Sequence, residues 1–205
     1  MFLTIEGCEG AGKSTLIESL CRRLEEGGRT VLITREPGGT PLGDQIRALL
    51  LSRSCPISAR AELMLFLTSR VQHIEEVIKP ALASGKVVLC DRFHDSTIAY
   101  QGAGRGLGLQ EVEALCMSCC MGFQADMTLL LDLDPEMGLR RITRERDSLE
   151  REPLDFHKRV REAFLRLAER HVGRIRLLNA SCDKEVLLDQ ALFAVEQALT
   201  QSHKR

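Results

Sequence analysis

The chain has 205 residues, of which 44% are hydrophobic and 28% are charged, values typical of a folded globular protein. Its 28 basic and 29 acidic side chains give a formal net charge of -1 at pH 7, so no wide surface for a nucleic acid is expected. The sequence has no run of about 18 apolar residues and no signal peptide at its N-terminus. These features predict a cytoplasmic protein with neither a membrane nor a nucleic acid as partner.

Eight cysteines are scattered through apolar segments, which favours reduced, buried side chains over a disulfide framework. Cys116 and Cys119 have the C-x-x-C spacing of zinc ligands, but no second pair of Cys or His residues follows nearby. A zinc site is therefore not expected.

Five short apolar runs predict β-strands at residues 2–5, 30–34, 87–90, 127–131 and 174–178. Segments with helical periodicity separate them, for example residues 63–78 and 156–167. This alternation predicts an α/β fold, a five-stranded parallel sheet flanked by helices on both faces. The runs are nearly continuous in Val, Ile and Leu, so both faces of each strand are expected to be buried. No repeat or linker divides the chain, and we expect one domain over residues 1–205.

The first predicted strand leads into a phosphate-binding motif. It matches the P-loop pattern G-x-x-x-x-G-K-S, in which glycines let backbone N–H groups curl around phosphates at the start of a helix. The residues predicted to bind ATP are Gly7, Cys8, Glu9, Gly10, Ala11, Gly12, Lys13, Ser14 and Thr15. Of these, Lys13 is expected to reach the β- and γ-phosphates, and Ser14 to offer its hydroxyl to Mg²⁺.

A P-loop usually works with a carboxylate at the end of another strand, and Asp91 follows the apolar run at residues 87–90. Ser14 and Asp91 are therefore the predicted magnesium ligands, with Mg²⁺ as the cofactor and ATP as the donor. A GTPase is excluded because Asn179, the only Asn, is followed by Ala180 and cannot form N-K-x-D. A nucleic-acid motor would need a broad basic surface. A kinase for a small molecule remains.

Two stretches decide the kind of kinase. Residues 91–102 read D-R-F-H-D-S-T-I-A-Y-Q-G, and residues 35–40, after the second strand, read R-E-P-G-G-T. Together with the P-loop they resemble the thymidylate kinase family of P-loop nucleoside monophosphate kinases, over the chain as far as about Ala168. Gly10, where the eukaryotic form carries an arginine, and the arginines near residue 144 suggest the bacterial form.

The resemblance implies transfer from ATP to dTMP by a homodimer, with dTMP and ATP as its small-molecule partners. It implies that Phe66 stacks on thymine beside Arg70, and that Arg47 and Arg92 hold the acceptor phosphate. It also implies that Tyr100 crowds the sugar 2' position. The other positions that it implies at the dTMP site are Glu9, Glu36, Pro37, Ser96, Thr97, Gln101 and Arg105.

A lid is expected at residues 140–152, in a stretch where residues 140–174 hold 11 basic and 7 acidic side chains. Arg141, Arg144 and Arg146 are candidates for the catalytic cation, with Lys13 and Arg92. If the lid is helical, at most two of the three can face the phosphates together. The family usually reads Asp-Arg where this chain has Asp147-Ser148, which leaves the choice among the three open.

Two other functions stay possible at this point. One is a kinase for another deoxynucleotide or a deoxynucleoside, and the other is a P-loop protein that binds ATP as a switch without transferring phosphate.

Overall fold

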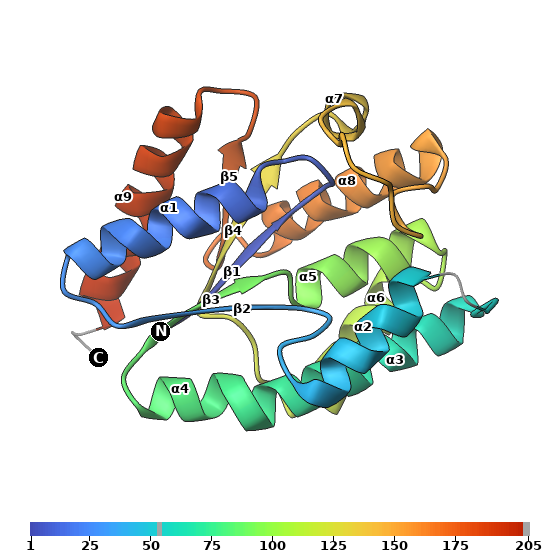
Figure 1. Cartoon of the computed structure of the whole chain (residues 1–205), viewed down its shortest axis with the longest axis horizontal. Helices are drawn as coiled ribbons and strands as arrows, with labels where there is room; N and C mark the ends of the chain where they lie inside the picture. The colour runs from blue at the N-terminus through green and yellow to red at the C-terminus, as the bar shows by residue number, and fades with distance from the viewer. Residues whose placement is uncertain (53–54, 203–205) are drawn as a thin grey trace.

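The structure, a computed structural model, describes residues 1–52 and 55–202 of the chain (Figure 1). Its strands are β1 (Phe2–Gly7), β2 (Val31–Arg35), β3 (Val87–Asp91), β4 (Met127–Asp132) and β5 (Ile175–Asn179). Its α-helices are α1 (Lys13–Glu26), α2 (Pro41–Ser52), α3 (Ala59–His73), α4 (Lys79–Ala83), α5 (His94–Thr97), α6 (Leu109–Cys119), α7 (Pro135–Arg140), α8 (Leu154–Arg170) and α9 (Lys184–Ser202). Two π-helical segments are η1 (Ile74–Ile78) and η2 (Ile98–Gly104).

The strands form one parallel sheet in the order β2-β3-β1-β4-β5, which confirms the predicted α/β architecture. Helices α1 and α9 pack together on one face, while α4, α5 and α8 lie against the other (Figure 1). Because all strands run the same way, the carboxyl ends of β1, β2 and β3 lie at one edge of the sheet. The P-loop and the segments after Arg35 and Asp91 therefore start side by side.

The two edge strands differ from the prediction that every strand is buried on both faces. In β1, β3 and β4 nearly every residue is buried, but β2 exposes Ile33 to 46% and β5 exposes Leu177 to 51%. An apolar run alone does not distinguish a central strand from an edge strand, since each edge strand has a neighbour on one side only.

The core lies in several clusters around the sheet. The largest joins β1, β3 and β4 to α1 and α9 through residues such as Ile5, Leu20 and Val195. A second joins α3, η2, α6 and α8 through Leu67, Tyr100 and Phe164, which confirms the amphipathic pattern predicted at residues 156–167. The helix predicted at residues 63–78 is also present, as α3 continued by η1.

All eight cysteines lie in the described part of the chain and are free thiols. Four are buried, but Cys55 and Cys119 are exposed, so the prediction of buried cysteines is wrong for these two.

The segment between α7 and α8 is not a helix, so the helical geometry considered for the lid arginines is wrong. Polar side chains form turns there instead: Asp147 accepts the N–H groups of Leu149 and Glu150 at 3.0 Å, and Glu150 accepts the N–H of Asp147 at 2.9 Å. Asp side chains that bond to nearby backbone groups compete with helix formation.

No helix in the described ranges is both long and apolar enough to cross a membrane.

Candidate active site

A cavity of about 690 Å³ opens at the carboxyl ends of β1, β2 and β3. Most of the residues predicted to form the site line it, although they come from β3, from helices α1, α2, α3, α5 and η2, and from loops including the segment after α7. The predicted residues that line it are Glu9, Gly10, Gly12, Lys13, Ser14, Thr15, Glu36, Pro37, Arg47, Phe66, Arg70, Asp91, Arg92, Ser96, Thr97, Tyr100, Gln101, Arg141 and Arg144. Gly7, Cys8 and Ala11 belong to the P-loop but not to the lining, and Arg105 and Arg146 also lie outside it.

The P-loop runs from the end of β1 to the start of α1, as its motif predicts. Gly10 has a φ of +68°, and a Cβ atom there would lie 2.1 Å from the carbonyl oxygen of Gly138 in α7. Only glycine fits such a close approach of two backbones. The contact seats the helix that precedes the lid directly on the P-loop.

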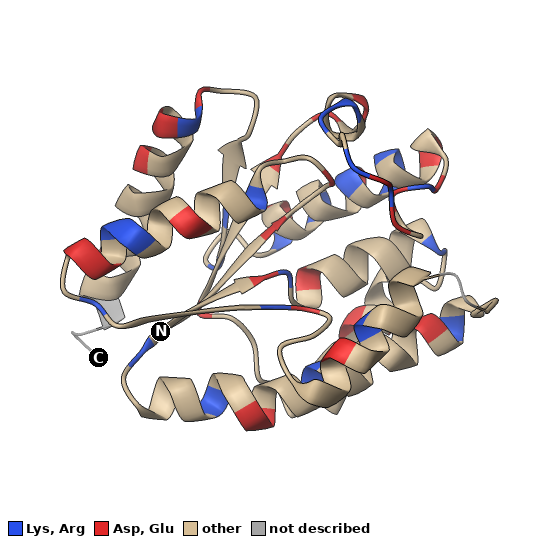
Figure 2. Ribbon diagram, viewed as in Figure 1, with Lys and Arg blue, Asp and Glu red and all other residues tan. Residues whose placement is uncertain are grey.

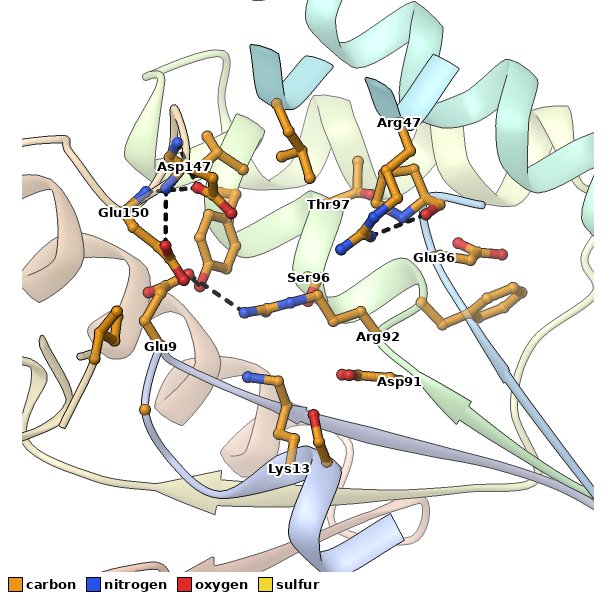
Figure 3. A pocket seen from close by; sticks show the side chains of 18 of the residues that line it. Glu9, Lys13, Glu36, Arg47, Asp91, Arg92, Ser96, Thr97, Asp147 and Glu150 are labelled. Carbon is orange, nitrogen blue, oxygen red and sulfur yellow. Dashed lines mark hydrogen bonds and ion pairs between the residues drawn. The ribbon is translucent and has the colours of Figure 1, made fainter. Parts of the chain in front are cut away.

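Lys13 is buried and donates to the carbonyl oxygens of Gly7 at 3.1 Å and Cys8 at 3.0 Å. Burial lowers the pKa of Lys13, and the nearby charge of Arg92 lowers it further. In Figure 3 the ends of the two side chains point toward the same space. Two cations held this way are complementary to an anionic ligand between them.

A divalent cation fits beside the P-loop. Oδ1 of Asp91 is buried and has no hydrogen-bond partner among the described residues, and the Ser14 hydroxyl lines the same cavity. The described residues contain no cluster of three or more His, Cys, Asp or Glu side chains suited to a metal. One carboxylate and one hydroxyl, from Asp91 and Ser14, suit Mg²⁺, which is commonly held by one or two protein groups together with water and substrate phosphates.

Arg92 follows β3 directly and has a φ of +71°, in the left-handed region that non-glycine residues rarely adopt. Its guanidinium donates to Gly7 O at 3.1 Å, to Ser96 Oγ at 2.9 Å and to Glu9 Oε1 at 3.3 Å. It also lies over the ring of Tyr100, 4.9 Å from the centroid. These contacts hold one planar, charged donor at the floor of the cavity (Figure 3).

Glu9 receives hydrogen bonds from three sides: from Arg92, from the Tyr100 hydroxyl and from Nδ1 of His157, at 3.2 Å. Because a carboxylate only accepts, the bond assigns the proton to Nδ1 of His157. Burial alone would raise the pKa of Glu9, but His157, Arg92 and Lys13 outweigh it and lower the pKa to about 2. Glu9 is thus ionised at neutral pH.

Phe66 and Arg70 of α3 line the same cavity. Arg70 is 1% exposed and is fixed by Glu36 Oε2 at 2.6 Å and by Thr97 Oγ1 at 2.9 Å. The other oxygen of Glu36 lies 3.0 Å from His73, which does not line the cavity. The helix therefore presents a ring and a cation to the cavity, and His73 lies outside the lining.

Gln101 lines the cavity and donates from Nε2 to Glu62 Oε1 at 2.9 Å. The same carboxylate binds Arg105, at 3.0 Å to each oxygen, and Arg105 also pairs with Glu152 at 2.9 Å. Two carboxylates thus hold the Arg105 guanidinium outside the cavity lining. The structure does not bring it to the position expected of a phosphate ligand.

Arg47 of α2 lines the cavity and donates to the carbonyl oxygen of Pro37 at 3.0 Å. Burial lowers its pKa, and the charge of Arg35 adds to the effect. Figure 3 shows that it enters the cavity from the side opposite Lys13.

Basic and acidic side chains follow each other closely along the segment between α7 and α8 (Figure 2). Arg141 lines the cavity and donates to Gly10 O of the P-loop at 3.3 Å, and Arg144 lines it while paired with both oxygens of Glu150. Arg146 instead donates to the carbonyl oxygen of Leu139 at 3.0 Å. The structure thus brings two of the three candidate arginines to the cavity.

The lining also contains Leu51, Phe93, Ile142, Thr143, Asp147, Leu149 and Glu150, which were not predicted as site residues. Three buried residues that support the lining from behind, Glu6, Glu62 and His157, were not predicted from the sequence either. Each is buried and bonded to a residue that lines the cavity or to its backbone neighbour. A signal existed only for Glu6, a carboxylate that directly follows the apolar run at residues 2–5. The partners of Glu62 and His157 lie 39 and 148 positions away along the chain, so spacing could not reveal them.

The fold and the site define a class. A parallel sheet with a P-loop after its first strand, a carboxylate at the end of the adjacent strand and arginines converging on the same cavity is the machinery of a P-loop phosphotransferase.

Comparison with known proteins gives the particular family. The sequence model of thymidylate kinase matches residues 5–191. The chain is 50% identical to a thymidylate kinase of Chlamydia muridarum over 199 residues, covering 95% of this chain and 98% of that one. It is 50% identical to one of Halothermothrix orenii over 204 residues, covering 97% and 98%. A crystal structure of thymidylate kinase from Ehrlichia chaffeensis superposes with a TM-score of 0.78 at 32% identity, covering 96% of this chain and 98% of that one. The chain belongs to the thymidylate kinase family.

Proposed function

We propose that this chain catalyses the transfer of the γ-phosphoryl group of ATP to dTMP, giving ADP and dTDP. One observation carries this function: Lys13 of the P-loop and Arg92 of the loop after β3 converge on one cavity that Phe66 and Arg70 also line. Such a cavity offers two phosphate sites in a row and a flat apolar wall for a base.

Different residues bind the donor and the acceptor phosphates. The P-loop backbone and Lys13 hold the β- and γ-phosphates of ATP, while Arg92 and Arg47 hold the dTMP phosphate. No general base is needed, because a phosphate monoester with a second pKa of about 6 is largely dianionic at neutral pH. Catalysis then consists of positioning and charge neutralisation.

The nucleoside of dTMP lies against Phe66, with Arg70, Thr97 and Gln101 at the edge of the base. Glu9 is ionised and faces the sugar 3'-hydroxyl, and Tyr100, which holds Glu9, occupies the space beside the 2' position. Glu36 supports this end of the site through Arg70.

Ser14 and Asp91 would hold Mg²⁺ bound with ATP, and the ion would supply positive charge that offsets the charge on the transferring phosphoryl group. Residues 140–152 act as a lid, and Arg141 or Arg144 supplies the catalytic cation.

We also infer a cytoplasmic homodimer. Eight free thiols suit a reducing compartment. Apolar side chains exposed on α2, α3 and α6 offer a surface for a second copy of the chain.

A nucleotide panel tests the function. With ATP and Mg²⁺ present, the purified protein is incubated with dTMP, dUMP, dCMP, dGMP and thymidine, and ADP formation is measured. We expect rapid ADP formation with dTMP, and with dUMP a rate about 10- to 200-fold lower, since one methyl group in an apolar pocket contributes that much. Preference for thymidine would indicate a nucleoside kinase, and ATP binding without transfer to any acceptor would indicate a switch protein.

A further inference from the structure

Glu6 is a buried carboxylate that lines no part of the cavity. It lies on β1, directly before the P-loop, and is 0% exposed. Its Oε1 accepts the backbone N–H groups of Phe93 at 2.7 Å and Ser96 at 3.3 Å, and its Oε2 accepts the Ser96 hydroxyl at 2.5 Å. All three donors belong to the segment that immediately follows Arg92.

Arg92 needs such support because its backbone is strained. Its φ of +71° is unfavourable for a residue with a side chain, so the surrounding contacts must compensate for it. The N–H of Arg92 is bonded to Ile5 O at 3.0 Å, and the next N–H, that of Phe93, is bonded to Glu6. Two consecutive residues of β1 thus fix the two peptide groups around Arg92.

The guanidinium is connected to Glu6 as well. Ser96 Oγ accepts from Arg92 Nη1 at 2.9 Å and donates to Glu6 Oε2. The same Nη1 donates to Gly7 O, the residue after Glu6 in the chain. Both the backbone and the side chain of Arg92 are therefore held in place by hydrogen bonds to β1, the strand that leads into the P-loop.

We propose that Glu6 is a positioning residue that sets the Arg92 guanidinium relative to the P-loop, and so places the acceptor phosphate in line with the donor. This inference rests on the proposed function in one respect, that Arg92 holds the acceptor phosphate. Glu6 acts through Arg92 and touches neither nucleotide.

A purely structural role makes a different prediction. If Glu6 only stabilised the fold, its replacement would lower the melting temperature and leave the kinetics of the folded protein unchanged. Thr4 provides the control: it lies two residues earlier on β1, is equally buried, and bonds to the Thr128 hydroxyl at 2.7 Å. It reaches the segment after Arg92 only indirectly, through Thr128 and Asp95, and makes no bond to Phe93, Ser96 or Arg92.

The test is a double-mutant cycle on the full chain with Glu6→Leu, Arg92→Ala and the double variant, with Thr4→Val as the control. We expect Glu6→Leu to lower kcat/KM for dTMP about 10- to 100-fold, the loss that a small displacement of a positioned group causes, with KM for ATP within about twofold of the wild type. In the Arg92→Ala background, Glu6→Leu should have no further effect on kcat/KM. Thr4→Val should change kcat/KM by less than about twofold. Additive effects of Glu6→Leu and Arg92→Ala would overturn the proposal.

Binding measurements separate this proposal from the proposed function. Calorimetry with dTMP and thymidine gives the contribution of the phosphate as a ratio of the two affinities. We expect Glu6→Leu to lower this ratio and to leave thymidine binding unchanged; an unchanged ratio would overturn the role of Glu6. A wild type that binds both ligands but transfers no phosphoryl group would refute the proposed function while the ratio still tests Glu6. If Glu6→Leu does not fold, Glu6→Gln replaces the oxygen that accepts from the Ser96 hydroxyl with an amide N–H, and it should lower the ratio by a smaller factor; no decrease would refute the inference.

Discussion

Glu9 shows how strongly the environment of one residue can set its charge. The carboxylate is 7% exposed, yet its pKa lies at about 2 because His157, Arg92 and Lys13 stabilise the ionised form against the cost of burial. Only His157 among these lies on α8, so this contact also ties the helix after the lid to the P-loop. The charge of the active site and the stability of the fold therefore depend on the same contacts.

The lowered pKa of Glu9 predicts a pH-dependent contribution to stability. Its pKa is lower in the folded protein than the ordinary value of 4.5, so the contribution is complete above about pH 4.5 and is lost as the pH falls toward 2. At 1.36 kcal/mol for each tenfold change in proton affinity, it amounts to roughly 3 kcal/mol.

The substitution Glu9→Gln tests this, with the free energy of unfolding measured by denaturant titration between pH 3 and pH 7. The variant should be less stable than the wild type at pH 7, and the difference should shrink below pH 4.5. A difference that stays constant over this range would contradict the lowered pKa.

Lys13 is expected to be essential for transfer and dispensable for folding. Lys13→Ala should lower kcat by about 10²- to 10³-fold, since it removes a cation that is already in place where negative charge develops. Lys79→Ala is the control, because Lys79 is half-buried, lies far along the chain from the P-loop and pairs across one helical turn with Glu75. Circular dichroism should show a folded protein in both cases. Retention of activity within threefold in Lys13→Ala would remove this lysine from the mechanism.

At the scale of the elements, the segment between α7 and α8 is held at both ends of the cavity. Gly138 of α7 contacts the P-loop, and further along Ser148 donates to the carbonyl oxygen of Leu50 in α2 at 2.8 Å. Leu149 packs against the cluster that contains Phe66. The segment thus runs from the P-loop to the side of the cavity where Leu50 and Phe66 lie.

The contacts of this segment distinguish the three candidate arginines: Arg141 and Arg144 line the cavity, and Arg146 does not. Alanine substitution of Arg141 or Arg144 should lower kcat by about 10³-fold for whichever acts on the transferring group, as removal of an arginine finger does. Arg146→Ala should change kcat by less than about threefold, because this side chain is bonded to Leu139 outside the cavity. Steady-state kinetics at saturating ATP and Mg²⁺ give kcat for each of the three variants. A large loss in Arg146→Ala alone would mean that the segment rearranges before transfer.

Local patterns predicted these elements well where one stretch of sequence determines its own structure. The strand predicted at residues 30–34 is Val31–Arg35, and the P-loop lies between strand and helix as its motif requires. The conformation of residues 140–152, the segment expected to form the lid, was not predictable in this way. The many charged residues of this segment suit an exposed helix equally well, and what prevents a helix is a set of turns centred on Asp147 and Glu150.

The site was predictable where the resemblance supplied residues one by one, and not where its geometry depends on distant contacts. Arg105 belongs to a motif rich in Gly, but two glutamates, Glu62 and Glu152, bind it away from the cavity. Glu62 lies in α3 and Glu152 in the lid, so only the folded chain brings them together.

At the scale of the whole molecule, one group of adjacent helices exposes several large apolar side chains. Helices α2, α3 and α6 lie side by side (Figure 1), and each exposes large apolar side chains: Leu42 and Leu49, Met64 and Val71, and Leu115. Met64 and Val71 are seven residues apart, so they lie on one stripe of α3. Exposed apolar side chains gathered on adjacent helices are typical of an interface between subunits.

A charge placed in that stripe should therefore separate the subunits. Burying an unpaired carboxylate in an apolar interface is costly, so Val71→Glu should convert a dimer into a monomer, as measured by sedimentation velocity over a range of protein concentrations. Phe193→Glu is the matched control, since Phe193 is more exposed than Val71 but lies on α9, on the other face of the sheet (Figure 1). It should remain dimeric.

Because α3 also carries Phe66 and Arg70, the monomer should bind dTMP more weakly than the dimer. Its affinity for ATP should change little, since the P-loop is expected to bind ATP. A wild type that sediments as a monomer at all concentrations would contradict the dimer, and dissociation by Phe193→Glu alone would move the interface to α9.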